Sequence, residues 1–71
     1  MDKERTLHRI AFMFNLLLER NRVQAIQDEG QNYLVSRIKG GYMVTFQDEH
    51  KDMVVVGRLI RKGVKYIPEA A

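Results

Sequence analysis

The chain has 71 residues, which is enough for one domain with one small hydrophobic core. It contains no cysteine, which excludes disulfide bonds, thiolate metal sites and a cysteine nucleophile. The formal net charge of +3 and the sequence pI of about 9.5 are compatible with a nucleic acid or an acidic protein as partner. Because so small a domain without disulfides is marginally stable, partner binding or oligomerisation is the expected source of further stability.

The first predicted element is a long N-terminal helix. Asp2 is a favourable N-cap residue, and neither Gly nor Pro interrupts residues 2–29. We expect a helix over about residues 2–22. An extension to residue 29, capped by Gly30, would place Asp28 and Glu29 in the last helical turn, where negative charge is unfavourable because of the helix dipole. Residues 23–29 therefore remain open between helix and strand. Six apolar residues share the face that we expect to cover the sheet: Leu7, Ile10, Ala11, Phe14, Leu17 and Leu18.

The run Ile10–Leu18 is more apolar than a helix with a single buried face needs, because eight of its nine residues are apolar. Phe12 and Leu16 project away from the sheet-facing side, and Met13 lies between the two sets. We therefore predict a protein-binding interface, most simply between the helices of a homodimer. The alternative is a sheet that curls far enough to cover these side chains. The predicted interface consists of Arg9, Phe12, Met13, Leu16, Arg20 and Val23.

From Gln31 onward, β-forming residues alternate with turn signals. The predicted strands cover about residues 32–38, 42–47, 53–60 and 64–67. The pair Gly40-Gly41 indicates a tight hairpin, and Gly57 indicates a β-bulge or a close approach of the backbone. The sequence thus predicts a single α+β domain over residues 1–71, with one N-terminal helix packed on a three- or four-stranded antiparallel β-meander.

The order of these elements resembles that of a known architecture. A helix containing residues 14–23 precedes a small antiparallel sheet that ends at Val64–Pro68. This order and size are similar to the Sm-like architecture of the Hfq family of RNA chaperones. The resemblance implies a strongly bent sheet, and it assigns no binding residue to this chain.

Basic residues concentrate in the second half of the chain. Residues 1–35 balance five basic with five acidic side chains, whereas residues 36–71 hold seven basic and four acidic ones. Such residues on a β-hairpin can line a phosphate backbone or meet an acidic protein, and Tyr33, Tyr42 and Tyr66 could stack with unpaired bases. The alternative is a solubilising surface that protects edge strands. The predicted cationic surface comprises Arg58, Arg61, Lys62 and Lys65, joined by Arg37 and Lys39 if their strands are adjacent.

The sequence does not indicate a catalytic or metal site. Ser36 is the only serine, it lies in a predicted strand, and neither His8 nor His50 is near it in sequence. The segment Asp48–Asp52 lacks the spacing of a Ca²⁺ loop and is predicted to be a solvated turn. We therefore predict a protein that is not an enzyme and that uses no metal or cofactor.

Membrane insertion and secretion also find no support. The apolar run is shorter than the roughly 20 residues that span a bilayer, and Asp2 and Glu4 precede it where a signal peptide carries basic residues. We expect a cytoplasmic protein.

The predicted function is that of a small non-catalytic interaction module, a dimeric regulator or inhibitor that binds another protein. The alternative is a nucleic-acid-binding regulator that uses the basic C-terminal hairpin. A small-molecule substrate is not expected.

Overall fold

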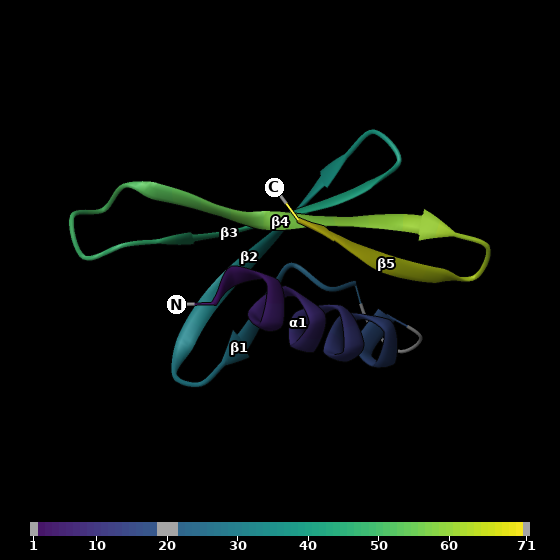
Figure 1. The fold of residues 1–71 in the computed structure, drawn as a ribbon, viewed down its shortest axis with the longest axis horizontal. Helices are drawn as coiled ribbons and strands as arrows, with labels where there is room; N and C mark the ends of the chain where they lie inside the picture. Colours follow the sequence, from purple (N-terminus) through teal and green to yellow (C-terminus); the bar gives the residue numbers. More distant parts are fainter. Residues whose placement is uncertain (1, 19–21, 71) are drawn as a thin grey trace.

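The computed structural model describes residues 2–18 and 22–70 (Figure 1). One helix packs against five strands that form a single antiparallel sheet in chain order. The elements are α1 (Lys3–Leu18), β1 (Ala25–Asp28), β2 (Gln31–Ile38), β3 (Gly41–Gln47), β4 (Met53–Lys62) and β5 (Lys65–Ala70). The predicted α+β fold with an antiparallel meander is confirmed, although the sheet has five strands rather than three or four.

The additional strand is β1, in the segment that the sequence left open between helix and strand. Residues 25–28 pair with β2, and Ile26 lies opposite Tyr33 with both side chains buried. Glu29 and Gly30 form the connecting turn with φ values of 49° and 80°, as a two-residue hairpin turn with two positive φ angles requires. The possible helical extension to residue 29, with Gly30 as its cap, is therefore wrong.

The hydrophobic core lies between α1 and the inner face of the curled sheet. The helix contacts β4 and also β1 and β5, the two edge strands of the sheet. Its buried residues are Thr6, Leu7, Ile10, Ala11 and Phe14. Leu17, predicted for the same face, is exposed, because the face that meets the sheet is centred on Leu7, Ile10 and Phe14.

A β-bulge and one glycine let the sheet wrap around the helix. The register between β3 and β4 shifts after Val44, which pairs with Gly57, whereas Thr45 pairs with Val55. A Cβ atom at Gly57 would lie 2.9 Å from the carbonyl oxygen of Glu69 and would overlap Leu7. The predicted bulge and close approach at Gly57 are confirmed, and they bring α1 against β4.

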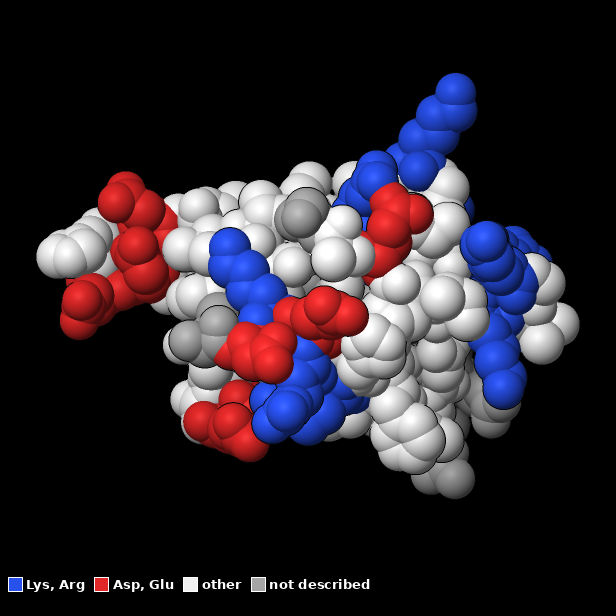
Figure 2. All heavy atoms as spheres, viewed as in Figure 1, with Lys and Arg blue, Asp and Glu red and all other residues white. Residues whose placement is uncertain are grey.

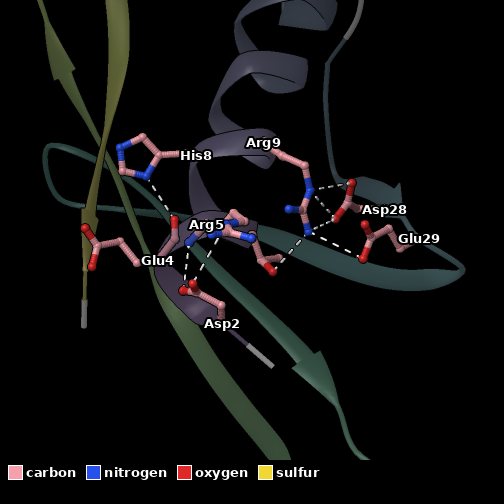
Figure 3. A network of polar contacts seen from close by, with 8 residues as sticks. Asp2, Glu4, Arg5, His8, Arg9, Asp28 and Glu29 are labelled. Atoms are coloured by element: carbon pink, nitrogen blue, oxygen red, sulfur yellow. Dashed lines mark hydrogen bonds and ion pairs between the residues drawn. The ribbon is translucent and has the colours of Figure 1, made fainter.

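One polar contact ties the helix to the first edge strand (Figure 3). The Arg9 guanidinium donates to the Asp28 carboxylate through Nε at 3.1 Å and through a terminal nitrogen at 3.0 Å, and this contact raises the pKa of Arg9. Glu29 lies 3.6 Å from the same guanidinium. Because Asp28 and Glu29 end β1 and begin its turn, Arg9 holds this hairpin against α1.

Asn15, the one polar residue of the apolar run, ties the helix to the other edge strand. Its side-chain amide donates to the Tyr66 carbonyl at 2.9 Å, and its oxygen accepts from the Tyr66 backbone N–H at 2.9 Å. The Asn15 amide thus makes the two hydrogen bonds with the Tyr66 backbone that a further strand beside β5 would make. Pro68 lies two residues further along β5, so its backbone nitrogen faces the same outer side of the strand as that of Tyr66. A proline nitrogen carries no N–H group. Both features protect the edge from pairing with another chain.

Candidate functional site

Three apolar side chains that face solvent lie around one groove. Phe12 is 68% exposed, Leu16 is 58% exposed, and Val64 in the turn between β4 and β5 is 93% exposed. Together with Asn15, Leu18 and Lys65 they line a groove of about 550 Å³ between α1 and this turn. We call it the helix–turn groove. Its walls are mostly apolar, and Lys65 is the charged residue among the lining residues that the structure describes.

A second hollow lies on the other side of Phe12. It has a volume of about 400 Å³ and is lined by His8, Arg9, Phe12, Met13 and Asp28. The Phe12 ring therefore separates two depressions on the solvent-facing side of α1. A partner that covers this ring would also reach the hollows beside it.

The other residues of the predicted interface contribute less to this surface. Met13 is partly buried against the core, and Val23 is only 8% exposed and belongs to the core. Arg9 is held by Asp28. Arg20 lies outside the described residues. The sequence missed Val64, which it placed in a strand, because the turn is formed by Gly63 and Val64 instead.

The basic residues of two hairpins meet at one end of the sheet. The Arg61 N–H donates to the Gly40 carbonyl at 3.1 Å, so the turn between β2 and β3 lies beside β4. Arg37 and Arg61 consequently line one hollow of about 170 Å³. Lys62 and Lys65 face each other across the ends of β4 and β5.

Arg58 differs from the other members of the predicted cationic surface. It lies opposite Glu69 across β4 and β5 and forms an ion pair with that residue. The alternation of side chains along β4 places Arg58 and Arg61 on opposite faces of the sheet. The structure therefore separates Arg58 from the hollow that Arg37 and Arg61 share.

Charge is distributed unevenly along the molecule. Figure 2 shows acidic side chains gathered at the end where the turn between β3 and β4 lies, and basic side chains at the opposite end, near the turn between β4 and β5. The acidic turn holds Asp48, Glu49 and Asp52. The helix–turn groove borders the basic end through Lys65.

The acidic turn is organised by its own backbone. The Asp48 carboxylate accepts hydrogen bonds from the backbone N–H groups of His50 at 2.9 Å and Asp52 at 2.8 Å. Within residues 2–18 and 22–70, no three His, Cys, Asp or Glu side chains come together as a metal-binding group. The Asp48 carboxylate thus has a structural role in the turn.

No protein-family model, curated protein or solved structure matches this chain. In the part of the chain that the structure describes, no helix has both the length and the apolar character needed to cross a membrane. The function is therefore inferred from the surface chemistry of this chain.

Proposed function

We propose that this protein is a small non-catalytic interaction module, acting in the cytoplasm as a regulator or inhibitor, that binds another protein through the helix–turn groove. The observation that carries the proposal is the exposure of Phe12, Leu16 and Val64 around one groove. Apolar pockets of this kind hold the anchor side chains of protein interfaces. Burial of one large apolar side chain is worth about 1.5–3 kcal/mol, so covering the groove is favourable.

Charge points to the chemistry of the partner. Lys65 lines the groove, Lys62 lies opposite it across the strand ends, and the part of the groove that the structure describes has no acidic lining residue. An apolar segment flanked by acidic residues complements this surface, since opposite charges steer association. In a symmetric homodimer, two identical basic grooves would instead face each other and bring like charges together.

The homodimer through α1 remains a prediction, and it would use the same surface. Sedimentation of the protein at micromolar concentration tests it. A mass of twice 8.3 kDa would support a dimer, whereas the mass of one chain over this range would leave the groove open to another protein.

Substitution of Leu16 with Glu is expected to weaken binding of an acidic amphipathic helical peptide at least about tenfold, because a carboxylate would enter the groove and repel the peptide. Fluorescence anisotropy measures the affinity, and thermal melting checks the fold. The matched control is Leu34→Glu, because Leu34 is also exposed but lies on β2, outside the groove. Equal affinities of Leu16→Glu and the unmodified protein would refute the groove as the binding surface.

Nucleic-acid binding is the second candidate function, and the meeting of the two basic hairpins favours it. Lys39, Lys62 and Lys65 lie at the hairpin ends, near the hollow that Arg37 and Arg61 line. Cations clustered in this way can follow a phosphate backbone.

For this candidate, we expect affinity for a single-stranded oligonucleotide to fall roughly 50-fold between 50 and 200 mM salt if about four phosphates are contacted. Binding in the apolar groove should change much less over the same range. A fluorescence titration at both salt concentrations compares the two modes. An oligonucleotide that fails to bind even at the lower concentration would eliminate this candidate.

A further inference from the structure

We infer that the hollow between Arg37 and Arg61, here named the arginine–tyrosine hollow, is a binding site for a phosphate group. It is lined by Arg37, Ile38, Gly40, Gly41, Tyr42, Arg61 and Tyr66. Among the residues that the structure describes, it shares no lining residue with the helix–turn groove. The inference gives the second candidate function a defined site, and it is independent of the protein-binding proposal.

The sheet register builds this hollow from two equivalent cross-strand pairs. Arg37 lies opposite Tyr42 across β2 and β3, and Arg61 lies opposite Tyr66 across β4 and β5. The Tyr42 and Tyr66 rings contact each other, with centroids 5.3 Å apart and planes at 66°. The two arginines therefore flank a pair of touching tyrosines.

The core holds the two tyrosines in place from below. The Phe14 ring lies 4.9 Å from the Tyr42 ring and 5.3 Å from the Tyr66 ring, measured between centroids. Phe14 itself is fully buried. The Asn15 amide also holds the backbone of Tyr66. The floor of the hollow is thus preorganised, which reduces the ordering cost of binding.

The charges around the hollow lack a counter-ion among the described residues. Arg61 donates through Nε to the Gly63 carbonyl at 3.2 Å, which orients its guanidinium without neutralising it. The Arg37 side chain makes no hydrogen bond or ion pair with any residue that the structure describes. Arg22, Arg37 and Tyr42 also line a neighbouring hollow of about 370 Å³. Across residues 2–18 and 22–70, neither hollow has an acidic lining residue.

This chemistry selects a compact oxyanion. Guanidinium groups donate in a planar fork that matches two oxygens of a phosphate, and tyrosine hydroxyls are additional donors. A volume of about 170 Å³ corresponds to roughly six water molecules at about 30 Å³ each, which is enough for one phosphate group. The phosphate can come from a nucleic acid strand or from a small phosphate ester.

Isothermal titration calorimetry of the full chain at low salt tests the site with three probes. These are inorganic phosphate, adenosine monophosphate and a single-stranded oligonucleotide. We expect inorganic phosphate to bind with a Kd in the millimolar range or below. Tighter binding of the mononucleotide or of the oligonucleotide distinguishes the two sources of the phosphate group.

The substitutions Arg37→Gln and Arg61→Gln should each raise the Kd for phosphate at least about tenfold, because each removes charged donors to the anion. Arg58→Gln is the matched control, because this arginine lies on the opposite face and pairs with Glu69. Thermal melting shows whether each variant is folded, and the ring resonances of Tyr42 and Tyr66 should shift on phosphate addition only in variants that bind.

Two results would overturn the inference. One is an equal loss of phosphate affinity in Arg58→Gln, which would indicate attraction by overall charge alone. The other is an oligonucleotide that binds while 10 mM inorganic phosphate does not, which would leave a diffuse cationic surface instead of a site. Neither result affects the helix–turn groove, which is tested by the Leu16→Glu substitution.

Discussion

Replacing Phe14 with Ala is expected to lower the free energy of unfolding by about 3–5 kcal/mol. The ring is fully buried and contacts both Tyr42 and Tyr66, so truncation removes apolar burial and leaves a cavity beneath the sheet. At about 0.05–0.15 kcal/mol per residue, a domain of 71 residues has a total stability of roughly 4–11 kcal/mol. The substitution therefore removes a large part of it. Urea denaturation followed by circular dichroism measures the loss.

Phe12→Ala is the matched control for Phe14→Ala. The two residues have the same side chain and lie two positions apart on α1, but Phe12 is largely exposed. We expect Phe12→Ala to change stability by no more than about 0.5 kcal/mol at protein concentrations that exclude self-association. Equal losses in the two variants would contradict the assignment of Phe12 to the surface and Phe14 to the core.

Replacing Gly41 with Ala is expected to cost more than about 3 kcal/mol, at the upper end of overpacking effects. A Cβ atom at this position would overlap the backbone carbonyl oxygen of Leu59 and would lie 3.1 Å from the Cα atom of Ile60. Backbone atoms cannot rotate away as a flexible side chain can, so β3 must separate from β4. Because the Arg61–Gly40 hydrogen bond lies beside this contact, the arginine–tyrosine hollow should open and phosphate affinity should fall as well. Thermal melting and calorimetry measure the two effects.

Gly40→Ala is the neighbouring control. Gly40 has a φ of 83°, and a Cβ atom there would meet nothing within 4 Å. Its substitution should therefore cost only the backbone strain of a left-handed alanine, about 1–2 kcal/mol. A smaller loss in Gly41→Ala than in Gly40→Ala would show that the two strands do not approach as closely as the structure indicates.

Local patterns were sufficient to predict most of the fold. The helical spacing of Leu7, Ile10 and Phe14 identifies residues that are buried in the structure, and Gly40-Gly41 marks a hairpin that forms. Both signals depend on neighbours within a few residues. The strand β1 was harder to predict, because four residues are too few to show a period and the Glu29-Gly30 turn resembles a helix end.

The candidate surfaces were predictable only in part. The angle around the helix axis separates Phe12 and Leu16 from the core face, and the structure leaves both exposed. The same argument does not apply to Val23, which lies beyond the described helix and is buried against the core. Likewise, the sequence grouped Arg58 with Arg61, whereas the alternation of side chains along β4 places them on opposite faces and Arg58 pairs with Glu69.

The sequence by itself determined the fold class and the excess of apolar residues on the helix, since both follow from composition and from periods of two and 3.6 residues. Only the tertiary structure decided the roles of the polar residues, both within the apolar run Ile10–Leu18 and beyond it. Asn15 completes the edge of β5, and Arg37 and Arg61 share one hollow although they are 24 positions apart. The physical reason is that these contacts depend on how the sheet curls around the helix, which results from packing between segments distant in the chain.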